Sequence, residues 1–404
     1  MRSNLRTSGA WARAALTAVA AAALLAGCGG GSDSIPLPTI RTVKVMGDSL
    51  ADVGTFGGIR ATVQGPAGAP QPVFPELVAT SYRMAQHCNF YTFTGTTFAP
   101  NPTAGCTNFA IGGGRINGAT AGMSAADPRN VVVQLQTAVA AGNHTANDLL
   151  LIDGGGNDAA DIVGLYLAIG QAAPGTPAQL AAVTTYGNAL KTVLPAATVD
   201  PRLATAQGLA DLGGLYMQAL AARFFDQIKT HALDKGARYV VLLNMPAITN
   251  TPRFQMVLNG IAAANGGGAT GTAARTAAET LFKNWVVAFN NELAAKVAGN
   301  ASILLVDFYG FFNDAVARPA LYGLTNVTTT ACPATGLGSD GLPTYSFPTC
   351  TTAALSATTP PAGATGGADW WRTYLFSDGF HPTPYGHALL ANQIRTALFN
   401  NSWQ

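Results

Sequence analysis

Five short apolar runs rich in β-branched residues alternate along the chain with longer stretches of helical pattern, and this alternation restricts the possible folds. Strands that alternate with helices pair in parallel, and a parallel sheet needs helices on both faces. We therefore expect an α/β domain in which chemistry gathers at the carboxyl ends of the strands. The expected strands are residues 43–46, 108–111, 149–153, 239–244 and 303–308, and the expected helices are residues 130–141, 204–235, 272–298 and 385–399.

The first part of the chain has the pattern of an export signal. An apolar run over residues 14–26 follows three arginines and is shorter than the roughly 20 residues that span a bilayer. This arrangement predicts a signal peptide over residues 1–27. Those three arginines belong to the 22 Lys and Arg residues, so 19 remain against 20 Asp and Glu. A near-neutral protein without a basic stripe is not expected to bind nucleic acid.

Leu25-Ala26-Gly27-Cys28 resembles the lipoprotein box of bacteria, in which the cysteine is lipidated after cleavage. The resemblance implies an anchor on Cys28, and Gly29 in place of Asp implies the outer membrane. The alternative is an ordinary signal peptide cut near Ala26, which would release a secreted protein. Residues 28–42 are rich in Gly, Ser and Pro and predict a tether, so the folded domain is expected over residues 43–404.

Four cysteines remain when Cys28 is set aside, and an even number in an exported chain predicts disulfides. The favoured pairing joins Cys88 to Cys106 and Cys332 to Cys350, because the two cysteines of each pair are 18 residues apart. The other two possible pairings stay open. None of the four cysteines forms a CxxC unit or neighbours a histidine at ligand spacing. We therefore expect neither a metal nor a cofactor.

Three stretches exceed what a minimal sheet with its helices requires. They are residues 161–200, which are rich in Ala and Leu, residues 259–272, which contain three consecutive glycines, and residues 325–369, which are polar and rich in Pro. Insertions of this length often form a rim or a lid at a binding site. The alternative is a helical scaffold plus a mobile loop, and the sequence does not decide between the two.

Ser49 lies on the turn that leaves the first apolar run, where a nucleophile is well exposed, although a serine there can also cap a helix. Asp378-Gly379-Phe380-His381, near the far end of the chain, carries a base and a carboxylate on one short segment. A serine hydroxyl needs such an imidazole to accept its proton and a carboxylate to orient that imidazole. His387 is the alternative base, but its place on an expected helix favours a packing or capping role.

Two glycine-rich turns could donate hydrogen bonds to an oxyanion. Gly112-Gly113-Gly114 leaves the second expected strand, and Gly154-Gly155-Gly156-Asn157 leaves the third, with a side-chain amide on Asn157. Each turn alone could be only a tight connection. Neither is a phosphate loop, since no Gly-Lys-Ser/Thr follows and no GxGxxG opens a helix.

Four segments of the chain, taken together and in order, resemble the four blocks of the GDSL, or SGNH, family of serine esterases and lipases. They are Gly47-Asp48-Ser49-Leu50, Gly113, Gly155-Gly156-Asn157-Asp158 and Asp378-Gly379-Phe380-His381. The resemblance implies a flavodoxin-like three-layer α/β/α sandwich with five parallel strands. A GxSxG elbow is absent, which argues against the α/β-hydrolase fold.

The resemblance also assigns roles by position. Ser49 would be the nucleophile and, through its N–H, an oxyanion donor beside Gly113 and Asn157. His381 would be the base and Asp378 its orienter, while the run of three glycines leaves the oxyanion glycine uncertain by one position.

We therefore expect a serine hydrolase that cleaves carboxylic esters through an acyl-enzyme and acts as a monomer. Lipid or other long-chain esters are one expected substrate class, and short-chain esters or acetylated polysaccharides are the other. The alternative function is a lipoprotein that binds lipid or glycan without turnover.

Overall fold

The computed structural model describes residues 37–84, 87–140 and 142–404. The expected signal peptide, Cys28 and most of the expected tether lie outside the described residues.

Four parallel strands form the main sheet of the described residues, in the order β1 (Thr42–Met46), β4 (Asp148–Ile152), β5 (Tyr239–Leu243) and β6 (Ile303–Val306). The last residues of neighbouring strands pair, as Met46 does with Ile152. The carboxyl ends therefore meet at one edge of the sheet, as the sequence predicts.

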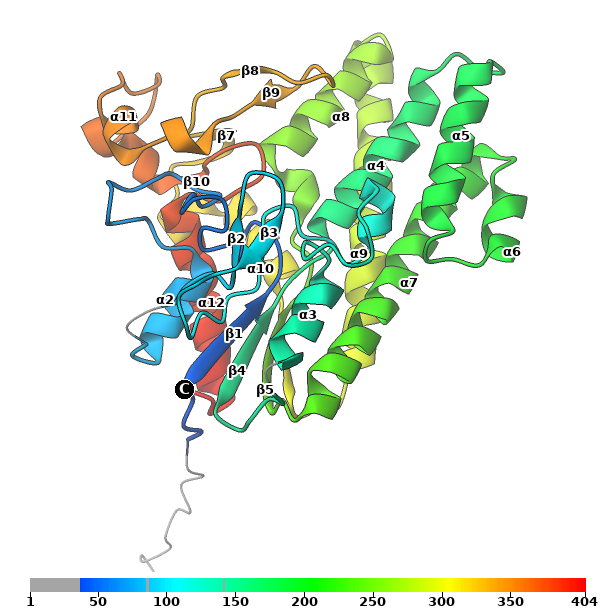
Figure 1. Ribbon diagram of the computed structural model, residues 1–404. Coiled ribbons are helices and arrows are strands. Elements are labelled where there is room, and N and C mark those ends of the chain that lie inside the picture. Colours follow the sequence, from blue (N-terminus) through cyan, green and yellow to red (C-terminus); the bar gives the residue numbers. More distant parts are fainter. Residues whose placement is uncertain (1–36, 85–86, 141) are drawn as a thin grey trace, which may run out of the picture. The chain divides into compact units, whose positions relative to one another are not determined.

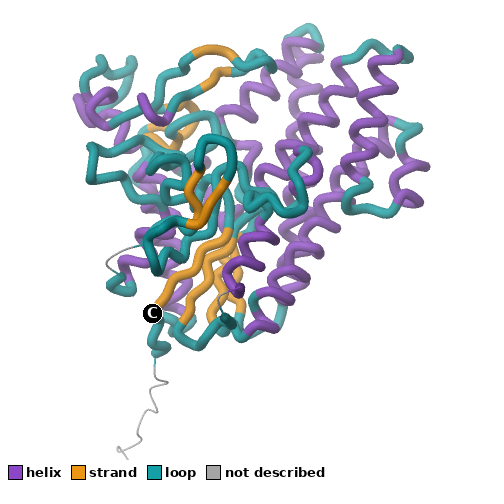
Figure 2. Tube along the Cα trace, in the orientation of Figure 1, coloured by secondary structure: helices purple, strands orange, loops and turns teal. Residues whose placement is uncertain are grey.

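Alternate residues of each strand pack into two different apolar cores, one on each face of the sheet. Met46, Leu150 and Val240 belong to one core, and Val45, Leu149 and Val241 belong to the other. Figures 1 and 2 show helices on both sides of the strands. The first core contains α3 (Val131–Ala140), α4 (Gly156–Gln171), α7 (Ala206–His231) and α9 (Gly268–Val297), and the second contains α2 (Phe74–Ser81), α10 (Phe308–Ala317) and α12 (Pro384–Asn400).

The expectation of five regular strands is not confirmed, because residues 108–111 only bridge to β1. Phe109 N–H donates to the Val45 carbonyl at 2.8 Å, but the next amide on that side, Ile111 N–H, reaches only the carbonyl of Gly47, beyond the end of β1, at 3.4 Å. The segment therefore runs beside β1 for a short distance and then turns into the glycine run.

The three expected insertions have different structures. Residues 161–200 form most of α4, α5 (Pro177–Leu190) and α6 (Ala196–Val199), and Tyr186 and Leu190 are buried in the first core. Residues 259–272 join α8 (Pro252–Ala264) to α9. Residues 325–369 hold the short elements β7 (Asn326–Thr330), β8 (Gly336–Leu337), β9 (Pro343–Thr344) and α11 (Thr352–Ser356).

Three two-stranded sheets complete the described fold, one of which pairs β8 with β9 in antiparallel fashion. The strand β7 pairs with β10 (Tyr374–Phe376), while β2 (Tyr91–Phe93) and β3 (Phe98–Pro100) form a hairpin. The disulfides join Cys88 to Cys106 and Cys332 to Cys350, the pairing that the spacing favours. Among the described helices, none combines the length and the apolar character needed to cross a membrane.

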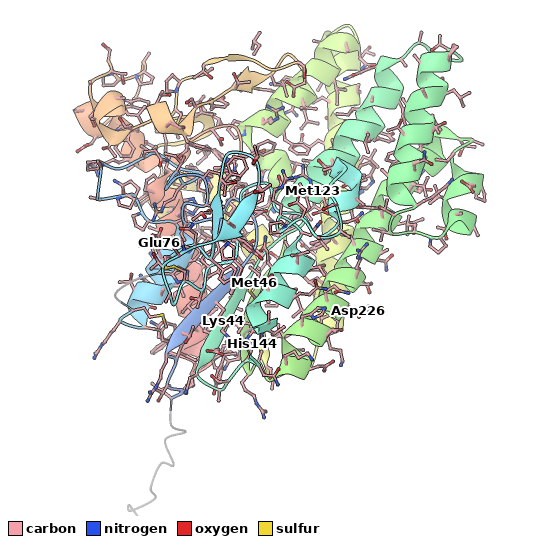
Figure 3. All side chains as sticks on the ribbon, viewed as in Figure 1. Lys44, Met46, Glu76, Met123, His144 and Asp226 are labelled. Atoms are coloured by element: carbon pink, nitrogen blue, oxygen red, sulfur yellow. A yellow bond between two sulfur atoms is a disulfide. The ribbon has the colours of Figure 1, made fainter. Side chains whose placement is uncertain are left out.

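Charged side chains gather beside the first strand, away from its carboxyl end. Lys44 Nζ lies 3.0 Å from Asp148 Oδ2 and 3.1 Å from His144 Nδ1. Figure 3 labels Lys44 and His144 below Met46, the last residue of β1. This cluster occupies the end of the sheet opposite to Ser49, which follows Met46 by three positions.

Candidate active site

The structure brings Ser49, His381 and Asp378 together at the carboxyl end of the sheet. His381 Nε2 lies 2.7 Å from Ser49 Oγ, across 332 positions of sequence. On the other side of the ring, His381 Nδ1 lies 2.9 Å from Asp378 Oδ2. These distances put an imidazole within hydrogen-bond reach of both a hydroxyl and a carboxylate, the arrangement that activates a serine.

The segment that carries Asp378 and His381 is a tight turn held by its own carboxylate. Asp378 Oδ1 accepts the N–H of Phe380 at 2.8 Å and the N–H of His381 at 2.7 Å. The turn is closed by Ser377 N–H, which donates to the His381 carbonyl at 2.7 Å. One carboxylate therefore fixes the backbone and the ring of the same histidine.

Charge pairing, rather than burial, decides the pKa values of this pair. Burial alone would raise the pKa of Asp378, but the charge of His381 and hydrogen bonds from the turn outweigh it and lower the pKa. Burial would lower the pKa of His381, but the charge and hydrogen bond of Asp378, with the charge of Asp48, raise it above its usual value. The site thus makes the neutral imidazole of His381 a stronger base, because it stabilises the imidazolium that forms when the ring accepts a proton.

Two side chains from other elements position the turn before Ser49. Gly47 N–H donates to Gln134 Oε1 at 2.7 Å, and Gln134 Nε2 donates back to the Gly47 carbonyl at 3.0 Å. Asp48 N–H donates to Asp153 Oδ1 at 3.0 Å. A Cβ atom on Gly47 would lie 1.7 Å from that same oxygen, so the position accepts only glycine.

Asp48 and Asp153 form a pair of buried carboxyl groups beside the nucleophile. Burial raises the pKa of Asp48. Burial and the charge of Asp48 together raise the pKa of Asp153 well above its usual value. Asp153 therefore keeps its proton to higher pH than an ordinary aspartic acid does.

The glycine run offers one free amide. Gly112 N–H donates to Asp52 Oδ2 at 2.8 Å, and Gly114 N–H donates to the Ile111 carbonyl at 2.9 Å. Gly113 N–H donates to no described residue, and the same holds for Ser49 N–H. Of the three glycines, Gly113 is the one whose amide is available to an oxyanion.

Asn157 is the second residue of α4 and lines the same groove as Ser49, Gly113 and His381. Its Nδ2 donates to the Gly114 carbonyl at 3.0 Å, which leaves the second hydrogen of the amide for a ligand. This contact ties the two glycine-rich turns to each other.

Arg115 and Asp158 hold the glycine run from behind. Arg115 Nη1 donates to the Gly113 carbonyl at 2.7 Å, and its Nε donates to Asp161 Oδ2 at 2.6 Å. Asp158 accepts the N–H of Ile116 at 3.0 Å, and burial raises the pKa of Asp158 to about 6. The sequence motif includes Asn157 and Asp158 but assigns no role to Asp158, and it does not include Arg115 or Asp161.

His387, the alternative base, is completely buried on α12. It is held inside the fold, as a packing residue would be. His144 contacts Lys44 at the other end of the sheet, and His231 closes α7. Within the part of the chain that the structure describes, no cluster of three or more His, Cys, Asp or Glu residues could hold a metal ion.

The sequence of this chain is similar to that of a known protein family. The model of the GDSL-like lipase/acylhydrolase family matches residues 43–394. A GDSL esterase/lipase of Arabidopsis thaliana is 26% identical over 182 residues, which are 45% of this chain and 43% of that protein. The chain therefore matches less than half of the length of this curated relative. Phospholipase A1 from Streptomyces albidoflavus NA297 aligns with a TM-score of 0.36 and 14% identity, over 88% of this chain and 98% of that one.

Proposed function

Because this chain belongs to the GDSL-like lipase/acylhydrolase family, we propose that it hydrolyses carboxylic esters through an acyl-enzyme on Ser49. The observation that carries the proposal is the unbroken line of contacts from Asp378 through His381 to the Ser49 hydroxyl. Family membership supports ester hydrolysis in general, and this line of contacts supports the particular mechanism.

In the first half of the reaction, Ser49 Oγ attacks the ester carbonyl carbon while His381 Nε2 accepts the hydroxyl proton. The carbonyl oxygen becomes an oxyanion, which accepts hydrogen bonds from the N–H groups of Ser49 and Gly113 and from Asn157 Nδ2. The bond to the alcohol oxygen then breaks, and the alcohol leaves with the proton from His381. The acyl group stays on Ser49.

In the second half, water attacks the acyl carbon and gives its proton to His381. The bond to Ser49 Oγ breaks, Oγ takes that proton back, and the acid leaves. Asp378 stays ionised throughout, because its pKa is lowered, and it stabilises the charged imidazole in both halves. No cofactor enters this scheme.

We further propose that the protein acts as a monomer outside the cytoplasm, anchored by a lipid on Cys28 in the outer membrane or else secreted. The sequence of residues 14–28 supports this proposal. Esters of the cell envelope or of the surroundings would then be its substrates.

Ser49→Ala tests the mechanism. We expect turnover of a p-nitrophenyl ester to fall by on the order of 10⁴-fold or more, because the nucleophile is lost. A fluorophosphonate probe should label the wild type but not the variant. Ser81→Ala on α2 is the matched control, since Ser81 only bonds the Val78 carbonyl of its own helix. Equal rates in Ser49→Ala and wild type would refute the mechanism, and absence of labelling in the wild type would favour a binding protein without turnover.

A further inference from the structure

Two hollows of different size meet at the nucleophile, and Ser49, Asn157 and His381 line both of them. One is a narrow cavity of about 130 Å³. The other is a wide groove of about 630 Å³. Apart from the polar residues next to Ser49, the narrow cavity is walled mainly by apolar side chains, among them Pro246, Ile248, Phe308, Phe312 and Phe380.

The wall of the narrow cavity that α10 forms belongs to the packed interior. Phe308 and Phe312 are 3% and 4% exposed, and Phe312 packs against Phe376 of β10 with ring centroids 5.7 Å apart. The start of α10 is also tied to the end of β5, because Asn244 Oδ1 accepts the N–H of Tyr309 at 2.8 Å. Widening the cavity on the α10 side would disturb a close-packed core, so this side limits its volume.

The wide groove has a different kind of wall. One side is formed by residues 345–348, which lie inside the loop closed by the Cys332–Cys350 disulfide. The other side includes Phe56, which is 37% exposed. An ion pair between Arg253, in the first turn of α8, and Asp340 links this loop to that helix. The groove is thus bounded by surface segments rather than by the core.

The order of events in an acyl-enzyme reaction assigns one part of an ester to each hollow. The acyl group remains attached to Ser49 between the two halves, so it can occupy a narrow cavity. The alcohol must leave, and water must enter, before the second half can begin. Both movements need the wider opening.

Resting on the proposed function, we propose that the narrow cavity binds the acyl chain and restricts it to short acids, while the groove accepts bulky alcohols. A dry cavity of about 150 Å³ takes up a molecule as large as benzene, which has six carbons. A cavity of about 130 Å³ therefore suits acyl chains of about four to six carbons. The substrate class is a short-chain ester of a large alcohol.

The acyl series tests this assignment on the unaltered chain. With p-nitrophenyl esters of two to sixteen carbons, kept below their solubility limits, we expect kcat/KM to peak at about four to six carbons and to fall at least tenfold by twelve. A kcat/KM that still rises from eight to sixteen carbons would overturn the inference while leaving ester hydrolysis intact. If no ester is hydrolysed and Ser49 is not labelled, the proposed function itself fails.

Two variants in the wall of the narrow cavity test its role in acyl selection. Phe312→Leu and Ile248→Ala enlarge the narrow cavity by different amounts, and each should move the acyl optimum to longer chains by about one to three carbons. Circular dichroism shows whether each variant is folded, and two independent positions keep the test valid if one is not. An unchanged optimum in both folded variants would overturn the assignment.

Tyr345→Ala alters only the groove. With butyrate esters of methanol and of naphthol, it should change the relative KM of the two alcohols at least threefold and leave the acyl optimum in place. If Tyr345→Ala shifts the acyl optimum and Phe312→Leu shifts the alcohol preference, the two hollows have the opposite roles and the proposal is wrong.

Discussion

The ring of Phe347 packs edge-on against the imidazole of His381, with the ring centroids 5.5 Å apart. Phe347 lies inside the loop closed by Cys332 and Cys350, and both ends of that loop are fixed: Cys332 N–H donates to the Ser377 carbonyl at 2.8 Å, and the Cys350 carbonyl accepts from Gln64 N–H at 2.8 Å. The disulfide-closed loop, which a minimal sheet with its helices does not require, therefore contacts the catalytic base His381.

Removing this disulfide should affect stability and activity together. In Cys332→Ser/Cys350→Ser we expect the free energy of unfolding to fall by about 3 kcal/mol, and kcat/KM to fall because Phe347 is no longer held against the base. Urea unfolding and ester hydrolysis measure the two effects. Cys88→Ser/Cys106→Ser is the matched control, because its cysteines are also 18 positions apart. Equal losses of activity in the two double variants would contradict the role of Phe347.

The acid limb of the activity profile should report His381. The imidazole must be neutral to accept a proton, and its pKa lies above the usual 6.5, so activity should fall as the pH drops through a value above 6.5. In Asp378→Asn the partner charge is gone, so the limb should move to lower pH while kcat falls by about 10⁴-fold. Initial rates between pH 5 and 9 measure both effects. Asp158, with a pKa of about 6, titrates in the same pH range as the acid limb. If the acid limb does not move in Asp378→Asn, the limb reports a group other than His381.

Asn157→Ala should lower kcat with little change in KM, because the amide binds the oxyanion more strongly than the ground-state carbonyl. We expect a loss of about 10²–10³-fold. Steady-state kinetics on a short-chain ester measure it, and Asn392→Ala, on the exposed side of α12, is the control. A rise in KM with an unchanged kcat would show that Asn157 only binds substrate.

His387 should make the fold sensitive to acid. Burial, with the charge of His381, lowers the pKa of His387 to about 3, below the 6.5 of the unfolded chain. Unfolding therefore takes up a proton between these values, and the stability that is complete above pH 6.5 is lost as the pH falls toward 3. At pH 4.5 this loss amounts to about 2–3 kcal/mol.

His387→Phe should remove that part of the pH dependence. Urea unfolding at pH 7.5 and pH 4.5 compares the variant with the wild type, which cancels the contribution of the carboxylates common to both. If the two proteins lose the same free energy on acidification, His387 is not responsible.

Most of the fold could be predicted from the sequence because its signals are local. The parallel sheet, four of the five expected strands and all four expected helices are confirmed to within a few residues. Residues 108–111 look like a strand in composition, but their contact with β1 weakens after Phe109, because Ile111 N–H lies 3.4 Å from the Gly47 carbonyl beyond the end of that strand. The bend into the glycine run depends on tertiary contacts and is not visible in the pattern of apolar residues.

The supporting residues of the candidate site were harder to predict. Gln134 lies in an otherwise apolar part of α3, and Asp153 directly follows an apolar strand, so each is a polar residue in a buried context. Buried polar groups need partners, and this is the signal that could have indicated both. Their partner, the backbone of Gly47 and Asp48, becomes apparent only when the helix and the strands are assembled.

The strand β1 lies at one edge of the sheet, where unpaired backbone groups could recruit a strand from a neighbouring molecule and start aggregation. Residues 107–109 cover that edge: Val45 N–H donates to the Thr107 carbonyl at 3.0 Å, and Thr107 Oγ1 donates to the Val43 carbonyl at 2.7 Å. The same stretch of chain leads into the turn that presents Gly113. A change that loosens it would therefore endanger solubility at high concentration as well as the oxyanion site.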